Sequence, residues 1–121
     1  MKEELIKFET AKLAKEKGFS VSCENSYREL LNNEYQLINS IHGYDFDINA
    51  PTQSLLQRWL REECKIHMEI IPYEEDPINK WCCVLYPLLC MKEPSNLGEF
   101  KTYEQALEIG LLEALKLIVV G

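Results

Sequence analysis

The sequence predicts an α+β fold with two layers, in which three main helices pack on a small antiparallel sheet. Amphipathic helical periodicity recurs near both ends and in the middle of the chain, and two apolar runs after the middle helix alternate as strands do. The expected order is α-β-(irregular)-α-β-β-α. A length of 121 residues suits one hydrophobic core, so residues 1–121 are expected to form a single globular domain.

The first predicted element is a helix over residues 2–17, because apolar side chains recur at helical spacing and Gly18 follows as a left-handed stop. Residues 19–23 alternate apolar and polar side chains, which predicts a strand. Residues 24–50 follow no single period. Their stretch 27–38 fits a helix or, in its second half, a short strand, so this segment is left irregular.

The middle of the chain predicts a helix over residues 51–64, starting at Pro51 or with Thr52 as its cap. The next two predicted strands, 66–71 and 81–86, are separated by a polar connection and should form a hairpin.

The C-terminal part predicts a short strand over residues 97–101 and a helix over residues 102–119. Thr102 and Gln105 have the spacing of a capping box. Gly110 costs a helix about 1 kcal/mol relative to alanine, which indicates close approach of this helix to the sheet.

Composition argues against several classes of function. The net charge of -7 opposes general attraction to nucleic acid. No stretch reaches the ~18 apolar residues of a membrane helix, and residues 1–5 do not resemble a signal peptide. The glycines are isolated, so no phosphate-binding loop is present and no cofactor is expected. We therefore expect a cytoplasmic protein without membrane contact.

Three segments resemble a family of small uncharacterised proteins of Bacteroides-type gut bacteria and their phages. Residues 51–62, PTQSLLQRWLRE, are similar to its central segment, and residues 8–19 and 102–115 are similar to its first and last helices. The resemblance implies a phage or mobile-element context. It implies no catalytic residue.

The polar side of the middle helix is one candidate binding surface, and aromatic residues of the irregular segment are another. Arginine is enriched at binding hot spots, whereas an ordinary charged helix face would carry the same residues. The candidate binding residues are Gln57, Arg58, Arg61, Lys65, Tyr35, His42 and Tyr44.

A metal site is the main chemical alternative. Cys64 and His67 have C-x-x-H spacing, and tetrahedral zinc accepts a mixed cysteine and histidine set. The hairpin cysteines Cys82, Cys83 and Cys90 would supply further ligands, with Cys83 chosen for the set. The ordinary interpretation is a buried thiol beside a half-exposed histidine.

Taken together, these features predict a small accessory protein of a phage or mobile element that binds a macromolecular partner, more readily a protein than a nucleic acid. No catalytic residue is assigned. Two alternatives stay open: a metal-binding protein or enzyme centred on Cys64 and His67, and a nucleic-acid binder that uses Arg58 and Arg61.

Overall fold

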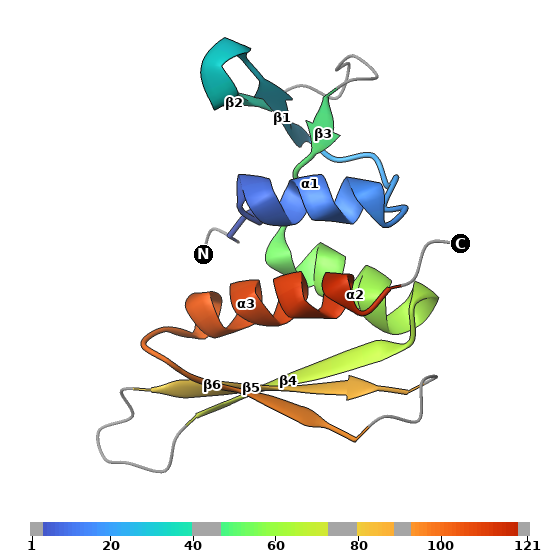
Figure 1. Ribbon diagram of the computed structural model, residues 1–121, viewed down its shortest axis with the longest axis vertical. Coiled ribbons are helices and arrows are strands. Elements are labelled where there is room, and N and C mark those ends of the chain that lie inside the picture. The colour runs from blue at the N-terminus through green and yellow to red at the C-terminus, as the bar shows by residue number, and fades with distance from the viewer. Residues whose placement is uncertain (1–3, 40–46, 73–79, 89–92, 119–121) are drawn as a thin grey trace.

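The computed structural model describes residues 4–39, 47–72, 80–88 and 93–118, apart from the side chain of Asn33. Within them the chain forms three α-helices and two antiparallel sheets of three strands each (Figure 1). The predicted α+β class and the order of elements are confirmed. The elements are α1 (Phe8–Glu16), β1 (Asn25–Glu29), a 3-10 turn (Leu31–Asn33), β2 (Tyr35–Asn39), β3 (Ile48–Asn49), α2 (Gln53–Glu63), β4 (Ile66–Pro72), β5 (Trp81–Pro87), β6 (Ser95–Phe100) and α3 (Tyr103–Lys116).

The helices form a layer between the two sheets (Figure 1). α2 and α3 cover one face of the sheet β4-β5-β6, which contains the predicted hairpin, and α1 lies between α3 and the sheet β2-β1-β3. Apolar side chains of the helices and of the inward face of β4 and β5 make the core. Its buried members include Ala11, Ala14, Leu56, Leu60, Met68, Leu85, Leu107, Leu111 and Leu115.

Helix α1 begins at Phe8 rather than at residue 2, because the chain before it pairs with the start of α2. Ile6 N–H donates to the Pro51 carbonyl over 3.0 Å, and Gln53 N–H donates to the Glu4 carbonyl over 2.8 Å. These backbone bonds require extended residues, so they exclude a helix there.

Residues 19–23 do not form the strand that their alternation predicted; the first strand begins at Asn25. Phe19 is buried and its ring meets Trp59 edge-on at 5.3 Å, whereas Val21 is 40% exposed. The alternation therefore reflected the anchored Phe19 and the partly buried Cys23, and no described strand pairs with this stretch.

The segment left irregular by its sequence contains the second sheet, with β1 between β2 and β3. One contact joins it to the chain before α1, and another joins two parts of the segment itself. The Tyr27 hydroxyl donates to the Ile6 carbonyl over 2.6 Å. Arg28 makes a bidentate pair with Asp47 at 2.9 and 3.0 Å, and that carboxylate side chain is only 3% exposed.

Side-chain caps define the starts of α2 and α3. Thr52 accepts a hydrogen bond from Leu55 N–H at 3.3 Å, so the second of the two predicted starts of α2 is confirmed. Thr102 accepts one from Gln105 N–H at 3.0 Å. Each threonine satisfies a donor that the first helical turn leaves unpaired.

Gly110 lies where α3 passes close to β4 and β5. A methyl group at this position would come within 2.5 Å of Cys83 Sγ and 3.2 Å of Met68 Sδ. The predicted close approach is confirmed, and the missing side chain is what permits it.

A buried glutamate joins the three helices. Glu108 of α3 is 6% exposed, and its carboxyl oxygens accept hydrogen bonds from Lys7 N–H at 3.0 Å, Thr10 Oγ1 at 2.5 Å and Gln53 Nε2 at 3.1 Å. Lys7 is the N-cap of α1 and has no side-chain cap of its own. Glu108 therefore caps α1 from a different helix, where the positive end of the helix dipole favours a carboxyl group.

The first prediction concerns the contact at Gly110. Gly110→Ala should lower the free energy of unfolding by roughly 1–3 kcal/mol, because overpacking outweighs the gain in helix propensity. Urea unfolding of this variant in the wild-type and Cys83→Ala backgrounds would measure the effect. The cost should shrink when Sγ of Cys83 is absent; an equal cost in both backgrounds would contradict the proposed clash.

The second prediction concerns the buried carboxyl group. Glu108→Ala should lower the free energy of unfolding by about 2–4 kcal/mol, since it leaves buried donors on two other helices unpaired. Glu113→Ala is the matched control on the same helix. Its exposed pair with Lys116 should contribute less than about 0.5 kcal/mol. Similar losses for both variants in urea titrations would refute a special role for Glu108.

Candidate functional site

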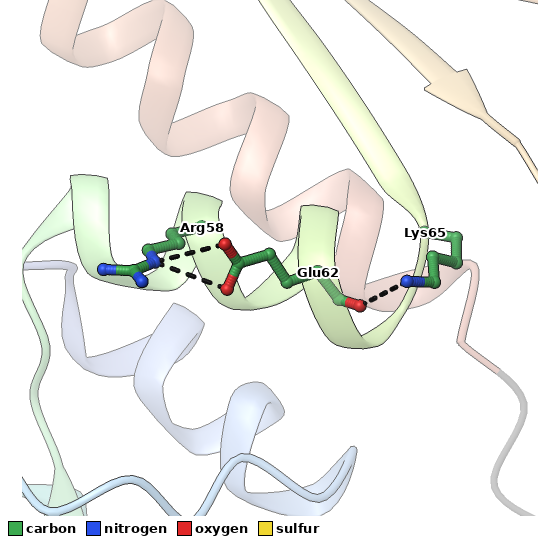
Figure 2. Close-up of polar contacts among 3 residues, drawn as sticks. All are labelled: Arg58, Glu62 and Lys65. Carbon is green, nitrogen blue, oxygen red and sulfur yellow. Dashed lines mark hydrogen bonds and ion pairs between the residues drawn. The ribbon is translucent and has the colours of Figure 1, made fainter.

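The outer face of α2 carries the first group of candidate residues. The helix buries Leu56 and Leu60 against the core, which directs the polar residues between them outward. Arg58 is 67% exposed in its side chain and pairs with Glu62 one turn later; its Nε lies 3.3 Å from both carboxylate oxygens (Figure 2). An exposed pair at this spacing is held only weakly.

Lys65 has a structural task at the end of the same helix. Its backbone adopts the left-handed conformation, with φ of 58°, directly after the C-cap residue Cys64. Its Nζ donates to the Glu62 carbonyl over 2.7 Å, as Figure 2 shows. The ammonium group thus satisfies a carbonyl at the negative end of the helix dipole, which explains a cation at this position without any partner.

Arg61 and Gln57 complete this surface. Arg61 is exposed, and among the described residues it has no hydrogen-bond or ion-pair partner. Gln57 is half-buried on the preceding turn. Of the predicted binding residues on α2, Arg61 therefore has the guanidinium group that is most available to an external ligand.

Tyr35 lies on a different surface from these residues. It belongs to β2, and its ring stacks on Phe8 at 4.3 Å and meets Tyr27 edge-on at 5.5 Å. In Figure 1 this sheet and α2 lie on opposite sides of α1. The other two aromatic candidates, His42 and Tyr44, lie outside the described residues. The predicted binding set therefore divides between two surfaces.

The three residues of the alternative metal site do not converge. The register pairs His67 with Tyr86 and Ile70 with Cys83, which places His67 on the outer face of the sheet and Cys83 on the inner face against α3. Cys64 lies at the end of α2. Cys90 lies outside the described residues, and the described ones contain no group of three or more potential ligands.

The described thiols also lack the environment of a nucleophile. Burial and then the Glu63 carboxylate raise the pKa of Cys64, and burial raises the pKa of Cys23. Burial raises the pKa of Cys83 to about 11. Arg61 and Lys65 thus do not produce the lowered pKa that a reactive cysteine beside them would need.

Three ionisable residues, His67, Glu69 and Tyr86, lie together on the outer face of β4 and β5, and the sequence predicted only part of this cluster. Alternation along the sequence places His67 and Glu69 on one strand face, but only the strand register adds Tyr86. His67 Nε2 lies 3.8 Å from Glu69 Oε1, and the Tyr86 hydroxyl lies 3.4 Å from Glu69 Oε2. No described helix covers this face in Figure 1, and the side chains of His67 and Glu69 are 39% and 49% exposed.

Two clefts beside α1, of about 280 and 590 Å³, were not predicted. Apart from Glu16 in the larger cleft, the charged groups that line them have partners within the chain. Asp47, in the smaller cleft, holds Arg28, and Lys12, in the larger, pairs with Glu29 at 3.4 Å. Neither cleft therefore presents a ready set of groups for a small charged ligand.

None of the helices in the described ranges has both the length and the apolar character needed to cross a membrane.

The third prediction concerns thiol reactivity. In the native protein at pH 8, Cys83 should react with a thiol reagent at least about a hundredfold more slowly than a free thiol, because it is buried and its thiolate is scarce. The raised pKa also means that the native state retains this proton longer than the unfolded state does, so its contribution to stability declines as the pH rises from 9 to about 11. Mass spectrometry of partially labelled protein would identify the modified residue; early labelling of Cys83 would contradict its burial.

Comparison with known proteins finds no relative: no family description, no curated protein and no solved structure matches this chain. Its function therefore has to be argued from the contacts and charges of its own residues.

Proposed function

We propose that this chain is a small cytoplasmic accessory protein that acts by binding an acidic protein partner through the outer face of α2. The observation that carries the proposal is the exposure of Arg58 and Arg61, one turn apart, on a helix whose opposite face is buried in the core. A partner can engage both guanidinium groups without any change in the packing of the helix.

The energetics of Arg58 support this use of the face. Its ion pair with Glu62 has i,i+4 spacing, and the two side chains are 67% and 52% exposed. Such pairs contribute about 0.3–0.5 kcal/mol to the stability of the fold. Arg58 can therefore exchange this carboxylate for one on a partner at little cost. Arginine offers planar, bidentate donors for carboxylates, which suits it to this role better than lysine.

The balance of charge favours a protein partner over a nucleic acid. Glu62 and Glu63 lie on the same turns as the arginines, and the whole chain carries a net charge of -7. A continuous polyanion would meet these negative charges along its length, whereas a protein can place carboxylates at the two arginines alone.

The biological setting in the proposal rests on the resemblance of residues 51–62 to the central segment of a phage and gut-bacterial family. That segment includes most of α2, with Gln57, Arg58 and Arg61. A shared binding surface would account for similarity in its exposed residues as well as in its buried ones.

The fourth prediction tests the arginine surface. The double change Arg58→Ala and Arg61→Ala should reduce capture of the partner from host lysate at least about tenfold, as loss of two hot-spot arginines does. Each change should alter the free energy of unfolding by less than about 0.5 kcal/mol, since both side chains are exposed. Quantitative mass spectrometry of the captured proteins and thermal unfolding would measure the two effects.

A matched control removes two exposed cations elsewhere, by Lys12→Ala and Lys116→Ala. Both lysines are about half exposed and each has one ion-pair partner. This variant should still capture the partner. Added salt should weaken capture by the wild-type protein, because it screens the contact between opposite charges. Equal loss in both double variants would refute a specific site on α2, and loss of capture after nuclease treatment would replace the protein partner with a nucleic acid.

A further inference from the structure

Strand β2 is one of the two outer strands of the sheet β2-β1-β3. One of its edges pairs with β1, and no described strand pairs with the other edge. An open edge exposes a row of backbone donors and acceptors that another strand can complete.

The alternation of hydrogen-bonded and non-hydrogen-bonded pairs between β1 and β2 identifies which backbone groups face this open edge. Leu30 N–H donates to the Glu34 carbonyl over 2.7 Å, so this pair is a hydrogen-bonded one. In an antiparallel ladder such pairs alternate with pairs whose backbone groups point away. The backbone groups of Tyr35, Leu37 and Asn39 therefore point to the open edge.

The pairing of β1 with β3, on the other side of the sheet, leads independently to the same assignment of outward-facing groups. Ala50 N–H donates to the Asn25 carbonyl over 2.9 Å, so Asn25 turns its backbone groups toward β3 rather than β2. Asn25 lies opposite Asn39 in the register. Asn39 therefore belongs to a pair without mutual hydrogen bonds, and its N–H and carbonyl face outward.

The three outward-facing positions are symmetric about Leu37, so the same strand of a second copy can pair with all three of them in the antiparallel direction. We propose that two copies of this chain associate by antiparallel pairing of their β2 strands, with Leu37 opposite Leu37 of the second copy. Tyr35 then lies opposite Asn39 of the second copy, and every outward N–H and carbonyl of these positions finds a partner. The two sheets become one continuous sheet of six strands.

The chemistry of β2 suits approach to its own copy. Its sequence, Tyr-Gln-Leu-Ile-Asn, has no charged residue and no proline, and its register with β1 contains no bulge. Natural proteins place charged residues, prolines and bulges on edge strands to prevent pairing between sheet edges, and β2 has none of these three. In a chain with a net charge of -7, this uncharged strand is a place where two copies can meet without placing like charges opposite each other.

Exposed apolar side chains on one face of β2 would also gain contacts. Tyr35 is 53% and Leu37 is 48% exposed, and both lie on the face that carries Tyr27. Stacking on Phe8 already holds the Tyr35 ring in place, so little side-chain freedom remains to be lost on association. Pairing would bring the two Leu37 side chains together across the symmetry axis.

This association is independent of the proposed function. In Figure 1, β2 and α2 lie on opposite sides of α1, so a dimer formed through β2 leaves the arginines of α2 accessible. The two interactions also respond oppositely to salt. Screening should strengthen a contact between two acidic chains and weaken capture of an acidic partner.

The fifth prediction tests the dimer by its mass in solution. Sedimentation equilibrium over roughly 5 to 500 µM, the range in which a small interface associates, should show the mass rising toward twice the 14.1 kDa of one chain. Added salt should lower the concentration at which this occurs. A single-chain mass throughout this range would overturn the proposal.

Two charge substitutions in the same strand locate the interface. Leu37→Lys places like charges opposite each other at the symmetry axis and should abolish the rise in mass. Gln36→Lys adds the same charge to an exposed position opposite Ile38 of the second copy, and this control should retain most of the association. A dimer that survives Leu37→Lys would overturn the proposed interface.

Amide hydrogen exchange of the wild-type protein gives a second measurement that needs no variant. On concentrating the protein, exchange at Tyr35, Leu37 and Asn39 should slow at least about tenfold, because their N–H groups become bonded. Exchange at Gln36 and Ile38, which already bond to β1, should change little. Equal slowing at all five amides, or at none of them, would contradict edge pairing.

Discussion

The carboxyl group of Glu108 is the contact on which the arrangement of the helices depends. It lies inside the protein on α3 and accepts hydrogen bonds from α1, from its N-terminal cap and from α2. Gln53 also donates to the Glu104 carbonyl at 3.0 Å, which ties the start of α2 to α3 a second time. Because a buried carboxyl group is tolerated only when its oxygens are paired, the three helices are constrained to this mutual position.

The central position of α3 follows from its two buried sides. Gly110 allows the helix to approach β4 and β5, whereas Glu108 faces α1 and α2. A helix that packs against a sheet and against two other helices leaves little surface to solvent. Its many buried residues, among them a glutamate, agree with this position between layers.

The layered arrangement also separates the surfaces available for binding. The arginines of α2, the open edge of β2 and the outer face of β4 and β5 lie at different levels of the molecule in Figure 1. Under our two proposals, one surface binds an acidic partner while another joins two copies of the chain. The resulting dimer would present two equivalent α2 faces, so a partner with two acidic sites could be bound with increased avidity.

The sequence by itself determined the elements whose evidence is local. Apolar spacing and capping residues located α2 and α3, alternation located the β4–β5 hairpin, and an unfavourable glycine indicated where α3 meets the sheet. Arg58 and Arg61 were placed on an exposed face for the same reason, because helical periodicity reports which side is buried. Only the tertiary structure decided the rest: the β2-β1-β3 sheet, the capping of α1 by Glu108 and the placement of His67 and Cys83 on opposite faces. These depend on partners distant in the sequence, and the pattern within one segment carries no information about which remote backbone or side chain will meet it.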